Sequence, residues 1–217
     1  MAASANTIIK VNGLKKHYNR GTIKALDGVS VDIYKGDVMV VIGPSGSGKS
    51  TLLKLFMRFW QVQQGEVKIS GKNVDAINTD NLRCVESFVT QDTHLFHDSI
   101  RNNLRLAKLD ATADEIIAAC KKASVHDFIM SLPKGYDTEV GELGDTLSGG
   151  ERQRVSIARA LAMKPDILCF DVPTSALDPD TERRLLERLA EAKGQRTVIF
   201  ITHRPSVLEY CDRVLRV

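Results

Sequence analysis

The sequence predicts an α/β fold with a mostly parallel sheet core, an antiparallel β part at the N-terminus and a helical lobe. One observation is a set of continuous apolar runs, which are typical of strands buried on both faces. These runs are VMVVIG (38–43), DILCF (166–170) and TVIFIT (197–202). A second observation is that patterns with helical spacing lie between them. Strands that alternate with helices indicate a parallel sheet with both faces covered.

The N-terminal part should begin with two strands, over TIIKVN (7–12) and SVDIY (30–34). The buried run at 38–43 then passes through a glycine-rich turn into STLLKLFMRFW (50–60). In that segment, five apolar residues recur at helical spacing: Leu52, Leu53, Leu55, Phe56 and Phe59. A strand, a loop and a helix in this order open a parallel α/β unit.

The middle of the chain is expected to form the helical lobe, inserted between two halves of the sheet. Residues 110–133 (DATADEIIAACKKASVHDFIMSLP) predict helices with a break near Ser124. Asp110 and Thr112 are both suitable N-caps, and Thr112 is the better one because Glu115 completes a capping box. After the lobe, GGERQRVSIARALAM predicts an amphipathic helix and TERRLLERLAEAK a charged one.

Bulk composition limits the classes of function. The net charge of +3 over 217 residues argues for neither nucleic acid nor an anionic membrane as a partner. No apolar run approaches the roughly 18 residues that cross a bilayer, and the N-terminus lacks a signal-peptide pattern. The cysteines have no C-x-x-C pairing and indicate reduced thiols in a cytosolic protein; they are Cys84, Cys120, Cys169 and Cys211.

A phosphate-binding loop is predicted at GPSGSGKST (43–51), which fits the P-loop pattern G-x-x-x-x-G-K-[ST]. Glycines let backbone N–H groups curl around phosphate oxygens, and the following helix adds its positive N-terminus. Lys49 would reach the β- and γ-phosphates, and the Ser50 hydroxyl would bind Mg²⁺. A Gly/Ser-rich turn is the alternative, but the buried strand before it and the helix after it favour a nucleoside triphosphate site. The predicted ATP-binding residues of this loop are Gly43, Pro44, Ser45, Gly46, Ser47, Gly48, Lys49, Ser50 and Thr51.

Two further features complete the prediction of a nucleotide site. Asp171 directly follows the buried run ILCF and is suited to hold Mg²⁺ from the far side of the phosphates. A turn-forming Asp before Val-Pro is the alternative, and the P-loop upstream favours the metal. LSGGERQR (147–154) supplies a second helix N-terminus of the anion-binding kind. Because one domain needs only one, the second is expected to serve a nucleotide bound mainly to another copy, in a head-to-tail dimer.

These motifs together resemble the nucleotide-binding domain of the ATP-binding cassette (ABC) transporter family, from about residue 7 to 217. GPSGSGKST and LSGGERQR are strong matches, and FVTQD, SALD and ITHRP complete the family's set of motifs. The resemblance implies a P-loop NTPase fold in one domain over residues 1–217. Its catalytic core would lie at about 1–84 and 155–217, and a helical lobe with the signature at about 85–154.

The resemblance also implies roles for single residues. Tyr18 would stack on adenine, Gln91 would sense the γ-phosphate and couple to a membrane subunit, and His203 would contact the γ-phosphate. Ser175-Ala176-Leu177-Asp178 resembles the loop that crosses the dimer interface. The implied catalytic residues are Lys49, Gln91, Asp171 and His203; the metal ligands are Ser50, Gln91 and Asp171; and the residues that act on the partner's nucleotide are Ser148, Gly149, Gly150 and Asp178.

Val172 stands where the family typically has a glutamate that orients or deprotonates the attacking water. Valine has no proton acceptor, and the loss of such help costs about 10²–10⁴-fold in rate. Lys49, Mg²⁺ and His203 would still position and neutralise the phosphates, so we expect ATP binding, dimer closure and slow hydrolysis. Glu151 and Asp178 are the nearest carboxylates by motif. Neither is a convincing substitute, because the family places them at the signature helix and the dimer interface.

The origin of Val172 is open at this point. It fits a degenerate subunit that works beside a competent partner, an introduced change, or a site at which another group substitutes. TEVGE (138–142) and QDTHLFHDSIRNNL (91–104) resemble exporter cassettes, whereas DVMVVIGPSGSGKSTLL (37–53) and IARALAMKPDILCFD (157–171) resemble polar amino-acid importers. This mixture indicates either a mosaic or engineered sequence, or one natural lineage with both sets of features.

The predicted function is that of the ATP-binding subunit of an ABC transporter, with ATP and Mg²⁺ as its ligands. The expected partners are a second nucleotide-binding domain and a transmembrane subunit that docks on roughly residues 85–135, and no nucleic acid is expected. Such a subunit would be cytoplasmic and peripheral at the inner face of the membrane. An ATP-gated clamp of a non-transport ABC protein is one alternative, disfavoured because the segment between the two motifs is too short for a long coiled coil. A scaffold with little activity is another.

Overall fold

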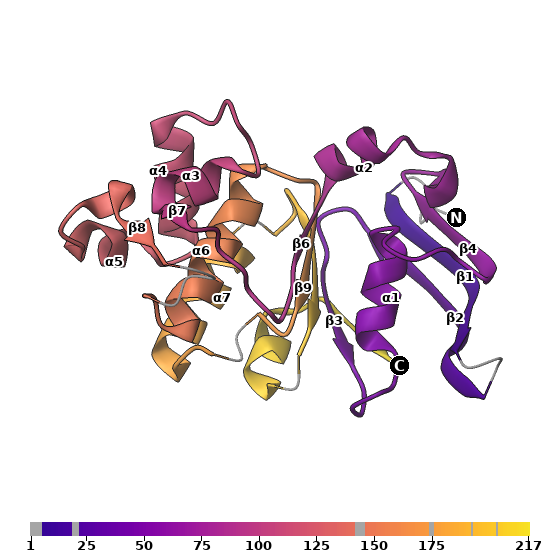
Figure 1. The fold of residues 1–217 in the computed structure, drawn as a ribbon. Helices are drawn as coiled ribbons and strands as arrows, with labels where there is room; N and C mark the ends of the chain where they lie inside the picture. The colour runs from indigo at the N-terminus through magenta and orange to yellow at the C-terminus, as the bar shows by residue number, and fades with distance from the viewer. Residues whose placement is uncertain (1–5, 19–21, 142–145, 174–175, 192, 203) are drawn as a thin grey trace.

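The computed structural model describes residues 6–18, 22–141, 146–173, 176–191, 193–202 and 204–217, and its centre is a sheet of five parallel strands (Figure 1). The strands follow the order β11-β3-β10-β9-β6. Their bounds are β3 (Val38–Ile42), β6 (Glu86–Val89), β9 (Ile167–Asp171), β10 (Thr197–Ile201) and β11 (Arg213–Arg216). This is the mostly parallel core that the continuous apolar runs predict.

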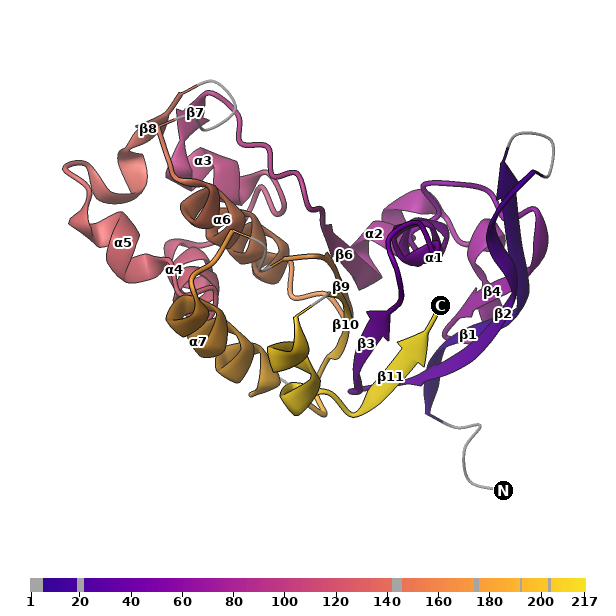
Figure 2. The same cartoon turned by 90° about the horizontal axis from the view of Figure 1, so that it is seen from below.

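A second, antiparallel sheet lies at the N-terminal side of the molecule, with strand order β2-β1-β4-β5. Its strands are β1 (Thr7–Tyr18), β2 (Ile23–Tyr34), β4 (Gln64–Ile69) and β5 (Lys72–Asn73). The long hairpin of β1 and β2 carries several register shifts between Thr7 and His17, which let one ribbon curve around its neighbour. Helix α1 (Lys49–Phe56) lies between this sheet and the parallel one (Figure 2).

The parallel sheet separates two apolar cores because successive side chains of a strand point to opposite faces. In β3, Met39 and Val41 pack with α1 and the antiparallel sheet, whereas Val38 and Val40 pack with the helices on the other face. Phe170 and Phe200 belong to that second core and stack with ring centroids 4.9 Å apart. The face is covered by α6 (Gly149–Ala162), α7 (Pro179–Ala190) and the helical lobe.

Short elements make up the helical lobe and the remaining connections. The lobe contains α3 (Ile100–Arg105), α4 (Ala113–Lys122), α5 (His126–Ser131) and the two-stranded pair of β7 (Asp98–Ser99) and β8 (Glu139–Val140). Outside it, α2 (Thr79–Val85) precedes β6. Three 3₁₀ turns span Val74–Ala76, Gly135–Asp137 and Pro205–Tyr210. Among the described residues, no helix has both the length and the apolar character needed to cross a membrane.

Several local predictions are confirmed. Thr112 accepts a hydrogen bond from the Glu115 N–H at 3.2 Å, and the Glu115 carboxylate accepts from the Thr112 N–H at 3.1 Å. These reciprocal bonds are the predicted capping box of α4. The predicted break also occurs, because α4 ends at Lys122 and Ser124 adopts a left-handed φ of 54°.

One helix boundary was predicted wrongly. The apolar spacing extends the first helix to Trp60, but α1 ends at Phe56. Arg58 adopts a left-handed φ of 48°, which an α-helix does not accommodate. Phe59 therefore lies outside the helix and is 48% exposed, although its spacing suggested a core position.

The start of the helical lobe also differs from the expected boundary at about residue 85. β6 pairs with β9 in the parallel sheet, so the first strand after residue 85 belongs to the sheet and not to the helical lobe.

Glu86 is a buried carboxyl group at the start of β6, and its side chain receives a hydrogen bond from Arg83. Burial raises the pKa of Glu86 to about 8 and outweighs the opposing effects of Arg83 and Arg58. Because the ordinary value is 4.5, the unfolded chain loses this proton first as the pH rises. Between the two values the folded state binds more protons, so stability falls as the pH rises.

We therefore expect the free energy of unfolding to decrease between pH 5.5 and 7.5 by up to about 1.4 kcal/mol per pH unit from this group. Glu86→Gln is the matched control, because its side chain is neutral throughout. Urea denaturation of both proteins at several pH values measures the difference. Identical pH profiles for the two proteins would show that Glu86 ionises normally.

Candidate functional site

The predicted P-loop connects the carboxyl end of β3 to the first turn of α1. Gly48 caps α1 with a left-handed φ of 94°, and a Cβ at this position would lie 2.0 Å from the Ala25 carbonyl oxygen of β2. At Gly43 a Cβ would lie 2.2 Å from the Val217 carbonyl oxygen. Only glycine fits either position, so the turn lies directly against its neighbouring strands. A turn of this kind before a helix N-terminus is a common site for phosphate groups.

Lys49 occupies the centre of the loop and is 6% exposed. Its ammonium donates hydrogen bonds to the carbonyls of Gly43 at 2.8 Å and Pro44 at 2.7 Å, and lies 3.5 Å from the Ser47 hydroxyl. Burial lowers the pKa of Lys49, and the negative charge of Asp171 partly opposes this effect. The loop thus folds around a buried cation that a phosphate would neutralise. The tip of the loop, Pro44 to Gly46, is exposed to solvent.

Asp171 is the last residue of β9 and is 7% exposed. Its Oδ1 atom is buried and has no hydrogen-bond partner. An ionised carboxylate oxygen in that situation is costly unless a cation binds it. No cluster of three or more His, Cys, Asp or Glu side chains able to hold a metal occurs in the part of the chain that the structure describes. Asp171 and the half-buried Ser50 are oxygen donors, the kind that Mg²⁺ prefers, and phosphate oxygens of a nucleotide would complete such a site.

Val172 follows Asp171 in a left-handed conformation with φ of 50°. Its N–H donates to the Ile201 carbonyl at 3.0 Å, which extends the pairing of β9 with β10 by one residue. The side chain is partly buried against the apolar core that contains α1. A β-branched residue in this region of φ is a genuine outlier, and the left-handed conformation costs roughly 1–2 kcal/mol. The residue after Asp171 is therefore a valine in a strained backbone conformation, with its side chain packed on an apolar core.

The signature segment forms the start of α6. Ser148 caps the helix by accepting from the Glu151 N–H at 3.3 Å, and the Glu151 carboxylate accepts from the Ser148 N–H at 2.7 Å. Asp178 caps α7 in a similar way, accepting from the Thr181 N–H at 3.0 Å. Hydrogen bonds from Thr181 lower the pKa of Asp178. Both carboxylates hold helix ends, so neither is placed to act as a base beside Asp171.

The P-loop and Asp171 lie at one edge of the parallel sheet, and the signature segment lies elsewhere in the same chain. The P-loop and Asp171 follow the carboxyl ends of β3 and β9, with β10 between them. That edge of a parallel sheet is where ligands of such folds bind. Figure 2 shows α1 and α6 on opposite sides of the sheet. In the signature segment, Gly149 and Gly150 lie close to Ala176, since a Cβ on either glycine would come within 3.4 Å of it.

The remaining predicted residues have mixed positions. Tyr18 ends β1, pairs with Ile23 of β2, and contacts Trp60 edge-on with ring centroids 5.8 Å apart. Its partner Ile23 lies on the same strand as Ala25, whose carbonyl approaches Gly48. Gln91 lies beyond the end of β6 and is exposed. His203 and Ser175 fall outside the described residues.

Sequence reasoning missed two polar residues next to the site. Gln153 of α6 is 2% exposed and contacts the backbone on both sides of the segment that follows Val172. Arg204 donates to the Leu177 carbonyl at 3.3 Å and to Glu182 at 3.0 Å. The available signal for Gln153 was its place on the apolar face of the predicted helix, where a polar residue needs a specific partner.

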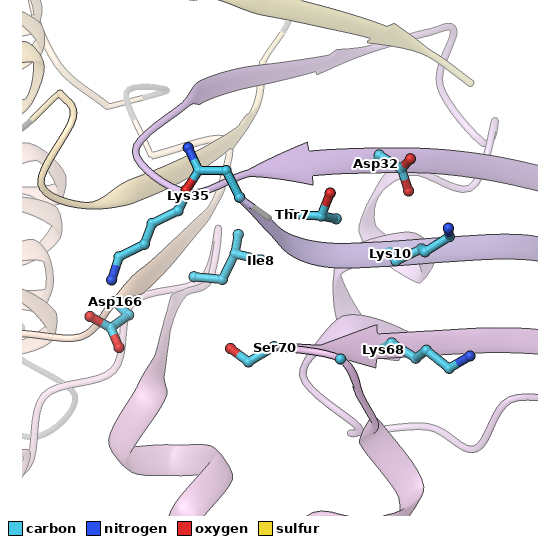
Figure 3. A pocket seen from close by; sticks show the side chains of 10 residues that line it. Thr7, Ile8, Lys10, Asp32, Lys35, Lys68, Ser70 and Asp166 are labelled. Carbon is cyan, nitrogen blue, oxygen red and sulfur yellow. The ribbon is translucent and has the colours of Figure 1, made fainter. Parts of the chain in front are cut away.

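A cavity of about 650 Å³ lies elsewhere, at the amino ends of the parallel strands (Figure 3). Lys35 and Asp166, which precede β3 and β9, line one side of it, and side chains of the antiparallel sheet line the other. The P-loop follows the opposite end of β3. This cavity is therefore separate from the candidate nucleotide site.

Comparisons with known proteins agree with these features. A family model described as "ABC transporter" matches residues 26–175. Over 99% of its length the chain is 42% identical to a probable ABC transporter ATP-binding/permease protein of Haemophilus influenzae, and covers 39% of that protein. Over 88% of its length it is 43% identical to the mitochondrial iron-sulfur clusters transporter ABCB7 of Oryzias latipes, and covers 26% of it.

A solved structure shares the fold. It is a bacterial Atm1-family ABC exporter with ATP bound, with a TM-score of 0.93 and 39% identity; the match covers 98% of this chain and 37% of that one. The chain thus spans less than two fifths of the length of these relatives. The importer-like character of residues 37–53 and 157–171 stays a prediction.

Proposed function

The chain belongs to the ABC transporter family, and on this premise we propose that it binds Mg-ATP and works as the ATP-binding part of a membrane transporter. The observation that carries the proposal is the buried, unpartnered Oδ1 of Asp171 at the same edge of the sheet as Lys49. Asp171 offers a buried oxygen that a metal ion can bind, and the P-loop offers the Lys49 ammonium to phosphate oxygens. Mg-ATP supplies both in one ligand.

In this proposal each residue of the site has a distinct task. The backbone of Gly43 to Gly48 and the Lys49 ammonium bind the β- and γ-phosphates, and Tyr18 stacks on the base. Asp171 and Ser50 would hold Mg²⁺, with Gln91 as a further ligand once the nucleotide is bound. The bound ion neutralises charge on the phosphates. Ser148, Gly149, Gly150 and Asp178 act on the nucleotide of a second copy or a paralogue, and His203 contacts the γ-phosphate.

Hydrolysis at this site should be slow. ABC proteins are ATPases as a family, but Val172 offers no proton acceptor to the attacking water. The carboxylates of Glu151 and Asp178 cap α6 and α7 and so leave that task unfilled. We therefore assign the chain to a subunit that binds ATP, closes a head-to-tail dimer and reopens slowly.

A groove between the helical lobe, α6 and β6 supports docking to a transmembrane part. It has a volume of about 340 Å³, and its lining includes Phe88, Phe96, Leu106, Arg159 and Met163. Phe96 and Leu106 are exposed apolar side chains, of the kind that marks interaction surfaces. Docking there would place the domain at the inner face of the membrane.

Calorimetric titration of the purified chain with ATP, in Mg²⁺ and then in EDTA, tests the proposal. We expect saturable binding of one ATP per chain, weaker when EDTA removes the metal. Mg-ATP should also raise the Tm of the chain. At a free ATP concentration of 100 times the Kd, binding adds about 2.7 kcal/mol to the free energy of unfolding. A chain that binds no ATP under either condition would be a scaffold and not an ATP-binding subunit.

A further inference from the structure

Residues 172–178 connect the metal ligand Asp171 to the cap of α7, and two buried or half-buried side chains hold this connection. Gln153 reaches it from α6, and Arg204 reaches it from the segment after β10. Neither residue has a part in the binding scheme described above. Their contacts join regions that serve two different nucleotides.

Gln153 uses both ends of its amide on the backbone of this connection. Its Nε2 donates to the Val172 carbonyl at 3.4 Å, and its Oε1 accepts from the Ala176 N–H at 3.4 Å. The side chain is buried, so water does not replace these partners. One side chain of α6 thereby contacts both Val172, beside Asp171, and Ala176.

The first turn of α6 packs against the same backbone. A Cβ on Gly150 would lie 2.9 Å from the Ala176 carbonyl oxygen, and one on Gly149 would lie 3.4 Å from the Ala176 Cβ. On the other side, both terminal nitrogens of Arg204 donate to the Leu177 carbonyl at 3.3 Å. Ala176 and Leu177 therefore lie between the signature turn and the segment that begins at Arg204.

We propose that Gln153 is a positioning residue. It couples Asp171 to the signature turn of the same chain, Ser148–Gly150, which binds the nucleotide of a second copy. A shift at Asp171 on binding Mg-ATP is carried through the Val172 carbonyl to Gln153, and so to Ser148–Gly150. Gln153 touches no nucleotide and acts only through the backbone that it holds. The inference rests on the proposed ATP-driven dimer and deepens it.

The test compares Gln153→Met with the parent. Methionine has a similar length but neither donor nor acceptor, so the Val172 carbonyl and the Ala176 N–H lose their partner. Ser156→Ala is the matched control, because Ser156 is another buried polar residue of α6 that faces the lobe groove instead. Three quantities are measured for each protein: ATP affinity of the dilute chain, dimer formation against Mg-ATP concentration by sedimentation velocity, and Tm.

We expect Gln153→Met to bind ATP within twofold of the parent, and to need at least about tenfold more Mg-ATP for dimer formation. Ser156→Ala should match the parent in both. Equal dimer formation by the parent and Gln153→Met would overturn this inference and leave the proposed function standing. A parallel loss of ATP affinity, Tm and dimer formation would also overturn it, since Gln153 would then serve only the fold. A parent that binds no ATP or forms no dimer would overturn the proposed function as well.

Discussion

Replacing Val172 with glutamate should raise the rate of ATP hydrolysis by about 10²–10⁴-fold, because it adds a positioned proton acceptor next to Asp171. The backbone should tolerate the change, although the lost apolar contacts of Val172 should lower the free energy of unfolding. Glutamate is not β-branched, so it fits the left-handed φ of 50° at this position no worse than valine does. Steady-state phosphate release with Mg-ATP measures the effect, and ATP affinity should change little.

Val172→Gln is the matched control for this prediction. Glutamine has nearly the same shape as glutamate and can orient a water, but it is not a base at neutral pH. It should therefore stay close to the parent rate. A parent that already hydrolyses ATP as fast as Val172→Glu would show that another group prepares the water, and that the assignment of Val172 as the defect is wrong.

Replacing Lys49 with methionine should weaken ATP binding by roughly 10- to 150-fold. The lysine ammonium makes charge-assisted hydrogen bonds to phosphates, each worth about 1.5–3 kcal/mol, and tenfold in affinity corresponds to about 1.4 kcal/mol. Methionine preserves the length of a buried side chain, so the apolar packing of α1 should be retained. Calorimetry with Mg-ATP measures the change.

Lys54→Met is the control for Lys49→Met. Lys54 also lies on α1, and its ammonium sits 4.8 Å from the centroid of the Trp60 ring, outside the P-loop. The Lys54→Met substitution removes one positive charge from the same helix, as Lys49→Met does, but leaves the P-loop unchanged. If the two variants lose equal affinity, the loss reflects general charge and not phosphate binding at the loop.

The central strands of the fold were predictable because their residues agree with burial on both faces. VMVVI, ILCF and TVIFI contain no charge, and each forms a strand of the parallel sheet. Two other strands of that sheet were not predicted. β6 begins with the buried carboxyl of Glu86, and β11 (RVLR) carries arginine at both ends. These charged residues interrupt the continuous apolar run by which a buried strand is recognised in a sequence.

The site divides in a similar way between local and tertiary information. The P-loop, the capping box of α4 and the position of Asp171 were predicted from short local patterns, and the structure contains that cap and a glycine-capped start of α1. Val172 adopts a left-handed conformation and donates its N–H to Ile201, about thirty residues away in the sequence. The two contacts of Gln153 join α6 to a segment about twenty residues away. Such contacts between distant segments have no signal in a local pattern.

We expect the parent chain to bind ATP and to keep it intact. The identity of the bound nucleotide tests this, after the parent protein has been incubated with Mg-ATP, separated from free nucleotide and denatured. The recovered nucleotide should be ATP in the parent and ADP in Val172→Glu. Recovery of ADP from the parent at the same rate as from Val172→Glu would contradict it.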